Sequence, residues 1–295
     1  TAEAGLLPWL FHEVAMKFAK PFSGVRAGEI YPTKFKVGDA VFGETGLDFG
    51  GNAEFLTIAA DQVVRKLPEF LSFESAALII DGPLTSYNFL TEVTKLKKEQ
   101  SILIIGASGS LGTAAVQIAK ALGAKVTGVS SSKNTDFVRS LGADEVIAYD
   151  QTPLEEVQST YDVVFDTIRA HTFQQVKHLL VDKGEYLTPV LRLKMLGELM
   201  GNVFRKGKKV KFSATGLLPA TKLHGMMDQI DKLLESQELQ LHIEKRFPLD
   251  DVVAAHQHID TGRKVGNIVL NVYPPSKLKT SSTTSVSESE KATLA

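Results

Sequence analysis

The feature that most constrains the fold of this chain is a glycine-rich turn between an apolar segment and a helical one. The segment 101–105 is apolar, and glycine then stands at every third position, at Gly106, Gly109 and Gly112. From 113 to 122 the apolar residues fall on one face of a helix. A buried strand that leads through a tight turn into a helix opens a strand–helix–strand unit, and such units build parallel sheets.

Further segments of both kinds alternate after this turn. Those expected to be strands are 126–129, 145–148, 162–165, 186–190 and 210–214, and those expected to be helices are 134–141, 173–180 and 222–236. Strands joined by crossover helices place helices on both faces of one sheet. The sequence therefore predicts an α/β fold with a doubly wound parallel sheet of the Rossmann type.

The chain on either side of this region has a different pattern of apolar residues and glycines. Alternating segments at 39–43 and 53–58 are separated by glycines and are expected to be strands of a small β domain. Before them, apolar residues from 10 to 18 are spaced for one face of a helix. Near the other end, the pattern predicts a helix over 252–259 and a strand over 267–272.

Composition excludes several classes of function. The formal net charge of −1 provides no basic face for a nucleic acid. No apolar run is long enough to span a bilayer and no signal-peptide pattern is found, so the cytoplasm is the expected compartment. The chain has no cysteine, which excludes a disulfide, a thiolate nucleophile and a cysteine-ligated zinc. His256 and His258 fall on different faces of their expected helix, and no histidine shows metal-ligand spacing, so no metal site is predicted.

The glycine-rich turn predicts binding of a dinucleotide. A turn without Cβ atoms lets a diphosphate approach the backbone closely, and the helix after it offers free N–H groups and the positive end of its dipole. Ser108 and Ser110 can add hydroxyl donors, and Leu111 lies in the same turn. The preceding strand, the following helix and the next strand at the usual distance make this pattern specific. The alternative is a strand–helix turn with only a structural role.

The end of the next strand indicates which dinucleotide binds. Sites for NAD place an Asp or Glu there, which accepts a hydrogen bond from the ribose 2′-hydroxyl. Residues 129–134 contain no acid, and they offer the hydroxyls of Ser131 and Ser132 and the ammonium of Lys133 to a 2′-phosphate. The sequence therefore favours NADPH. The alternative is that Lys133 is a solvated residue at a helix start.

Five blocks of the sequence resemble one family. They are FKVGDAVFG at 35–43, GNAEF at 51–55, GASGSLGTAAVQIAK at 106–120, LGADEV at 141–146 and GNIVL at 266–270. In combination these blocks are similar to the medium-chain dehydrogenase/reductase superfamily. Within it, the chain resembles the zinc-free, zeta-crystallin-like quinone-oxidoreductase branch, and the similarity runs from about Ala27 to Val272.

The resemblance implies a division of the chain into domains. A GroES-like substrate domain would comprise residues 1–80, completed by 247–273, a Rossmann domain would comprise 81–246, and the polar residues 274–295 would form a disordered tail. The family's first strand and its Asn- or Ser-bearing loop, which helps to shape the substrate pocket, are not found, so a shortened substrate domain is expected. The family also implies a homodimer, joined through the edge strand near 210–214.

The resemblance also places individual residues at the cofactor. Thr85 matches a threonine beside the nicotinamide, and Tyr149 matches a residue near the adenosine; their alternatives are a helix cap and a strand-edge aromatic. Ile168 stands where the family has a glycine after an Asp-Thr pair, which changes the nicotinamide side. The expected cofactor-binding set is Thr85, Gly106, Ser108, Gly109, Ser110, Leu111, Gly112, Ser131, Ser132, Lys133, Tyr149, Thr188, Val190, Phe212 and Ser213.

The activity that the resemblance implies is hydride transfer from NADPH to a quinone or to the β-carbon of an α,β-unsaturated carbonyl, without a metal. The cofactor carries the difficult step, and the protein holds the two reactants together. Tyr87 is the one candidate for a proton donor, and water would also serve. The alternative is a non-catalytic NADPH-binding protein with an incomplete substrate domain. A zinc alcohol dehydrogenase is excluded because its ligands are missing.

Overall fold

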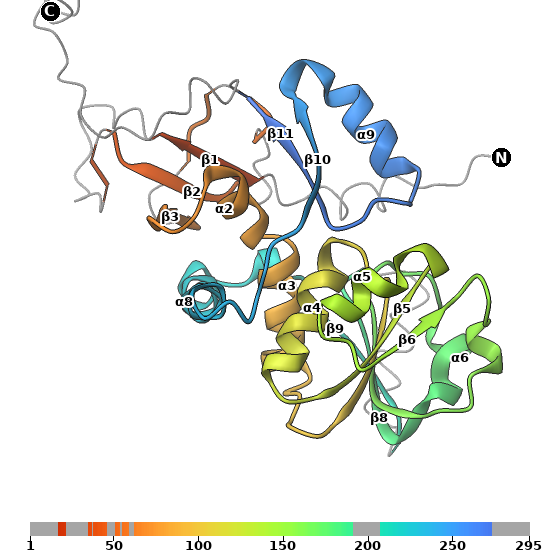
Figure 1. Cartoon of the computed structure of the whole chain (residues 1–295). Helices are drawn as coiled ribbons and strands as arrows, with labels where there is room; N and C mark the ends of the chain where they lie inside the picture. The colour runs from red at the N-terminus through yellow and green to blue at the C-terminus, as the bar shows by residue number, and fades with distance from the viewer. Residues whose placement is uncertain are drawn as a thin grey trace, which may run out of the picture.

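The structure of the chain is a computed structural model that describes residues 17–21, 35–36, 38–45, 51–53, 55–58, 62–190 and 207–272. It has two parts, one built on a six-stranded sheet and the other on two small sheets that lie above it in Figure 1. No helix among these residues is long and apolar enough to cross a membrane. The tail 274–295, predicted to be disordered, lies outside the described residues.

The six-stranded sheet confirms the predicted Rossmann-type fold. Its strands are β4 (Ser101–Ile105), β5 (Lys125–Ser130), β6 (Glu145–Ala148), β7 (Tyr161–Asp166), β8 (Leu180–Thr188) and β9 (Lys209–Phe212). They are all parallel and stand in the order β6-β5-β4-β7-β8-β9. The order reverses between β4 and β7, and ligands of doubly wound sheets bind outside the carboxyl ends of the strands at such a point.

Helices cover both faces of this sheet. They are α3 (Gly82–Tyr87) with its π-helical continuation η2 (Asn88–Val93), α4 (Ser110–Ala121), α5 (Thr135–Ser140), α6 (Phe173–Val176) and α8 (Ala220–Glu235). Strand β4 divides its side chains between the faces, because neighbouring residues of a strand point in opposite directions. Ile102 and Ile104 join the core under α3, α4 and α8, whereas Leu103 and Ile105 join the core on the face of α6.

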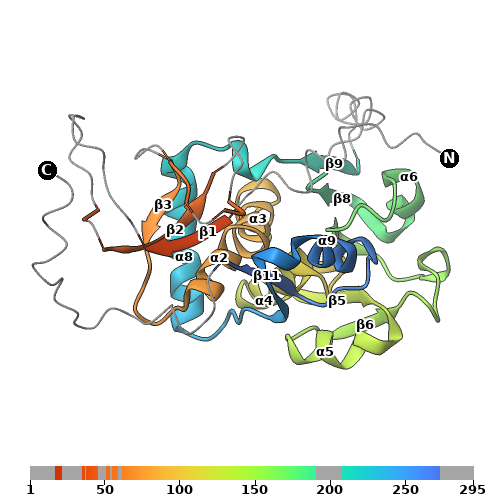
Figure 2. The same cartoon turned by 90° about the horizontal axis from the view of Figure 1, so that it is seen from above.

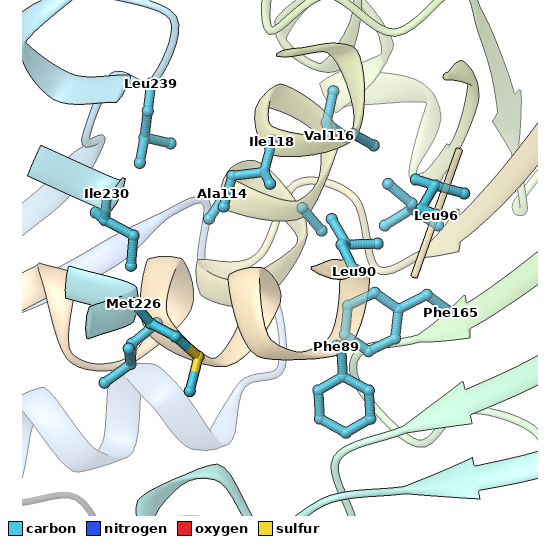
Figure 3. Packing of buried hydrophobic residues seen from close by; sticks show 14 of the residues in the cluster. Phe89, Leu90, Leu96, Ala114, Val116, Ile118, Phe165, Met226, Ile230 and Leu239 are labelled. Atoms are coloured by element: carbon cyan, nitrogen blue, oxygen red, sulfur yellow. The ribbon is translucent and has the colours of Figure 1, made fainter. Parts of the chain in front are cut away.

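The two cores fix β4 firmly, because all four of these side chains are at most 2% exposed. Burying each contributes about 1.5–3 kcal/mol to folding. Figure 3 shows the larger core, where Phe89 and Leu90 of η2 lie beside Phe165 of β7 and side chains of α4 and α8. The rings of Phe89 and Phe165 stack with centroids 5.1 Å apart. The strand that leads into the glycine-rich turn is therefore held from both sides.

The other part contains an antiparallel sheet of β1 (Lys17–Pro21), β2 (Ala40–Glu44) and β3 (Val64–Lys66), with α2 (Phe73–Ile79) packed nearby. Its second sheet pairs β10 (Ile243–Pro248) with β11 (Asn267–Asn271), and α9 (Val252–Asp260) lies against them. In both views of the molecule β11 and α9 lie over α4 and β5 (Figures 1 and 2). The closing segment thus reaches the carboxyl edge of the large sheet.

Two local predictions for this part are wrong. The helical pattern over 10–18 ends in a strand, because Phe18 lies in β1 and pairs with Gly43 of β2; residues 10–16 lie outside the described part. The segment 53–58 is not a strand at its described residues, 53 and 55–58. Both patterns were short, and tertiary pairing decides the state of such segments.

Candidate functional site

The three glycines of the turn differ in whether the structure requires glycine at their positions. Gly106 has a φ of +79°, which favours glycine, and a Cβ there would lie 2.8 Å from Oγ1 of Thr167. A Cβ on Gly112 would collide with the carbonyl oxygen of Gly106, so this glycine permits close packing of α4 on the turn. Gly109 differs, because the nearest atom to its Cβ position is 3.4 Å away. The packing around residue 109 therefore leaves room for a Cβ, and close contacts within the fold do not explain this glycine.

Gly109 is also the N-cap of the twelve-residue helix α4, and no side chain caps the helix at this position. Uncapped N–H groups at a helix start, together with the positive end of the dipole, favour an anion. The turn is tied to the next strand, because the N–H groups of Gly106 and Ala107 both donate to the carbonyl of Val129. The backbone of the turn is therefore positioned before any ligand binds.

The hydroxyls of Ser108 and Ser110 differ in what they can still do. Ser110 Oγ lies 2.8 Å from Oδ2 of Asp81 and 2.6 Å from Oδ1 of Asn267. Its single proton is engaged by these acceptors, so its side chain belongs to the scaffold and only its backbone N–H can serve an anion. Ser108 Oγ accepts a hydrogen bond of 3.2 Å from Nδ2 of Asn134, which leaves its own proton to donate.

The second part of the molecule contacts the turn directly. The N–H of Gly266 donates to the carbonyl of Ser108 at 2.8 Å, and Gly109 and Gly266 form a parallel β-bridge. Gly266 has a φ of +69°, and a Cβ there would lie 2.8 Å from the carbonyl oxygen of His242. The glycine in the sequence block 266–270 thus allows the segment before β11 to reach the dinucleotide turn.

Ser131, Ser132 and Lys133 follow β5, as predicted, and Lys133 is exposed. The structure adds a carboxylate that the sequence of this loop does not contain. Both oxygens of Asp150 accept from Ser132, one from its N–H and the other from its hydroxyl, each at 2.7 Å. These hydrogen bonds, first from the hydroxyl and then from the N–H of Ser132, hold the pKa of Asp150 below its usual value.

Tyr149 lies between β6 and Asp150, with 58% of its surface exposed. Its N–H donates to the carbonyl of Ser130, which extends the pairing of β5 and β6 by one residue. An exposed ring at the carboxyl end of a strand, close to the loop after β5, offers a face on which a base can stack. The placement of Tyr149 near an adenosine stays a prediction.

On the other side of the turn lie Thr188 and Val190, expected near the nicotinamide, and Phe212 and Ser213, expected near the outer end of the cofactor. Thr188 ends β8 and is 1% exposed, and it pairs with Phe212 at the end of β9. Ser213 follows Phe212, and its hydroxyl accepts a hydrogen bond of 2.9 Å from the buried amide of Asn88. Val190 donates its N–H weakly to Oγ1 of Thr188, at 3.4 Å. The structure therefore gathers these four residues at the ends of β8 and β9.

Thr85 lies inside α3 and not at its cap, which is Asp81. The start of α3 touches the glycine turn, because a Cβ on Gly82 would collide with the carbonyl of Ser110. Tyr87 is different: burial raises its pKa, and the carboxylate of Glu92 adds to this shift. Tyr87 ends α3 and is followed by η2, and its role as a proton donor stays a prediction.

Ile168 is placed against the turn by a rigid loop. Asp166, at the end of β7, is 0% exposed and accepts hydrogen bonds from the N–H groups of Ile168, Ala170 and His171 and from the hydroxyl of Tyr186. Ile168 is 54% exposed, and its Cγ2 lies 2.7 Å from the Cβ position of Gly106. A branched apolar side chain therefore stands beside the dinucleotide turn, where the sequence comparison with the family leads one to expect a glycine.

Among the described residues, no group of three or more His, Asp or Glu side chains could hold a metal ion. His258 instead pairs with Glu244 of β10, with Nε2 and Oε2 3.1 Å apart. Sequence reasoning missed Asn134, Asp150 and Asn267 as parts of the site. The signals that could have found them were weak. Asn134 and Asp150 are polar residues shortly after predicted strands, and Asn267 lies in the sequence block 266–270.

Known proteins resemble this chain over most of its length. A family model described as zinc-binding dehydrogenase matches residues 141–270. A quinone oxidoreductase from Pseudomonas aeruginosa is 32% identical over 254 residues, which cover 81% of this chain and 76% of that protein. A 2-methylene-furan-3-one reductase from Solanum lycopersicum is 30% identical over 251 residues, covering 81% of this chain and 59% of that protein.

A solved structure agrees with the fold. The Escherichia coli quinone oxidoreductase, crystallised in complex with NADPH, matches with a TM-score of 0.72 at 24% identity, covering 86% of this chain and 80% of that one. The topology of the sheet, the glycine turn and the relatives agree with one another. The chain therefore belongs to the medium-chain dehydrogenase/reductase superfamily, in its quinone-oxidoreductase branch.

Proposed function

We propose that this protein is an NADPH-dependent oxidoreductase that transfers a hydride to a quinone or to an α,β-unsaturated carbonyl without a metal. The observation that carries the proposal is the open backbone at Gly109, at the uncapped start of α4 and at the switch point of a parallel sheet. The names of the relatives support the acceptor, since one is a quinone oxidoreductase and the other acts on a conjugated methylene ketone.

The residues present fit a dinucleotide. The N–H groups of Ser110, Leu111 and Gly112 and the hydroxyl of Ser108 would hold the diphosphate. Ser131, Ser132 and Lys133 would hold the 2′-phosphate, and Tyr149 would cover the adenine. The expected nicotinamide contacts are at Thr85, Thr188 and Val190, and Phe212 and Ser213 would lie near the outer end of the cofactor. Bound NADPH supplies the hydride, and the protein orients the ring and excludes water.

The acceptor explains why no Lewis acid is required. A quinone or an enone is already an electrophile, so positioning it beside the hydride donor is the main task of the protein. The proton that completes the reduction would come from water or from the hydroxyl of Tyr87. We also propose that the protein acts in the cytoplasm and forms a homodimer, in which the edge strand β9 pairs with β9 of a second copy.

One observation favours a second candidate, a non-catalytic NADPH-binding protein. Ile168 occupies space beside Gly106, at a position where the resemblance leads one to expect a glycine on the nicotinamide side. Purified protein separates the two candidates through the loss of NADPH absorbance with a panel of quinones and enones. Turnover supports the oxidoreductase, whereas tight NADPH binding with no turnover on any acceptor supports the binding protein. No binding of NADPH would contradict both.

The 2′-phosphate assignment is tested by Lys133→Glu. The reversed charge should weaken the binding of NADPH by about tenfold or more and change the binding of NADH little, because only NADPH carries the 2′-phosphate dianion. Lys125→Glu is the matched control, since Lys125 begins the same strand at its opposite end. Titration of each nucleotide by fluorescence provides the measurement. Equal weakening of NADPH and NADH in Lys133→Glu would exclude this loop as the phosphate site.

A further inference from the structure

The loop 131–133, which is proposed to bind the 2′-phosphate, is hydrogen-bonded to the carboxylate of Asp150. Strands β5 and β6 pair in parallel, with Ser130 opposite Ala148, so the residues that follow them meet at the carboxyl edge. This pairing brings Asp150 to Ser132, although the two are 18 residues apart. Two short hydrogen bonds, both of 2.7 Å, fix the carboxylate in that place.

This arrangement changes what the loop can recognise. The N–H and the hydroxyl of Ser132 are the donors that a phosphate would use, and Asp150 accepts from both. The negative charge of Asp150 also offsets the positive charge of Lys133, so the loop and its partner carry no net charge. A dianionic phosphate therefore gains less from this loop than from one with free donors and a net positive charge. A ribose 2′-hydroxyl, by contrast, needs an acceptor, and a carboxylate near the end of the second strand is the acceptor that NAD sites use.

We propose that Asp150 is a specificity-determining residue that reduces the preference for NADPH and allows the protein to use NADH as well. The inference rests on the proposed cofactor site but adds a residue and a cofactor to it. Ser131, Lys133 and the backbone attract the phosphorylated nucleotide, whereas Asp150 competes for the Ser132 donors and accepts from the free 2′-hydroxyl. The choice between the two nucleotides is therefore set by residues from two strands.

The test is Asp150→Asn, which keeps the shape of the side chain and removes its charge. We expect the variant to bind NADPH more tightly and NADH more weakly, so that the ratio of their dissociation constants shifts toward NADPH by about tenfold. Asp136→Asn is the matched control: it removes the same charge from α5 just after the loop, where Asp136 is 95% exposed and pairs with Arg139. Its ratio should change by less than about twofold.

Three results are distinguishable in fluorescence titrations of the unmodified protein and both variants. A tenfold shift in Asp150→Asn alone supports the inference. An unchanged ratio, or weaker NADPH binding in Asp150→Asn, overturns it, the latter because Asp150 would then orient Ser132 for the phosphate. If the unmodified protein binds both nucleotides but shows no turnover, the proposed activity fails while the inference stands, because its readout is binding alone. Thermal unfolding of the variants confirms that the exposed substitutions leave the fold intact.

Discussion

The two sides of the carboxyl edge, around the reversal between β4 and β7, are built in different ways. On the side of β4, β5 and β6, the groups that face a ligand are mainly backbone N–H groups and short hydroxyls from residues close together in the sequence. On the side of β7, β8 and β9, buried side chains such as Asp166, Asn88 and Thr188 hold the edge together. Substitutions on the first side should therefore lower the affinity for a nucleotide and leave stability nearly unchanged. Substitutions of the buried residues on the second side should lower the free energy of unfolding.

The largest effect is expected from Asp166→Asn, on the second side. Oδ1 of Asp166 accepts from two backbone N–H groups, and Oδ2 accepts from one and shares the proton of Tyr186 with the carbonyl of His171. An amide would place its own N–H groups against the donors at one of these two oxygens. Unpaired buried donors cost about 1–3 kcal/mol each, so we expect the free energy of unfolding to fall by about 3 kcal/mol. Denaturant titration measures this fall. Tyr186→Phe removes one hydroxyl, whose single proton is shared between Oδ2 of Asp166 at 3.2 Å and the carbonyl of His171 at 2.8 Å, so it should cost only about 1 kcal/mol. Similar losses for both variants would contradict the described network.

A pair of glycine substitutions tests the first side. Gly109→Ala should leave the unfolding temperature nearly unchanged, because its Cβ has room, but should weaken NADPH by about tenfold or more through contact with the diphosphate. Gly112→Ala should lower both the unfolding temperature and the affinity, since its Cβ collides with the carbonyl of Gly106. Calorimetry and nucleotide titration distinguish the two. A stable Gly109→Ala variant with full affinity would remove the main support for the dinucleotide site.

The smallest effect is expected from Ile168→Ala, at the junction of the two sides. Shortening this half-exposed side chain frees space beside Gly106 and disturbs no buried partner, so stability should change by less than about 0.5 kcal/mol. We expect the affinity for NADPH to rise by about threefold, equivalent to about 0.6 kcal/mol. Titration with NADPH measures the change. Weaker binding would show that Ile168 packs against the cofactor instead of obstructing it.

The sequence predicted the sheet and the glycine turn because their signals are local. An apolar run such as Ile102–Ile105 has to be buried, and spaced glycines before a helix leave few other structures. The same reasoning located Ser131 and Lys133, which directly follow a predicted strand. These elements can be predicted without knowing which distant residues they contact.

Other parts of the site depend on pairings that no local pattern contains. Reading residues 129–134 alone gave a loop without an acid, yet the register of β5 and β6 brings Asp150 to it. The hydroxyl of Ser110 was expected to be free for a phosphate, yet it is engaged by Asp81 and by Asn267, which is 157 residues away. Short segments such as 53–58 failed for a related reason, because the neighbours that decide their state are set by the tertiary fold.

The contact between Gly266 and Ser108 has a mechanical consequence. The segment before β11 is hydrogen-bonded there to the glycine-rich turn, which is expected to bind the coenzyme. An opening of the two parts would have to keep this contact as a pivot or break it, and would also separate Arg65 of β3 from Asp228 and Asp231 of α8.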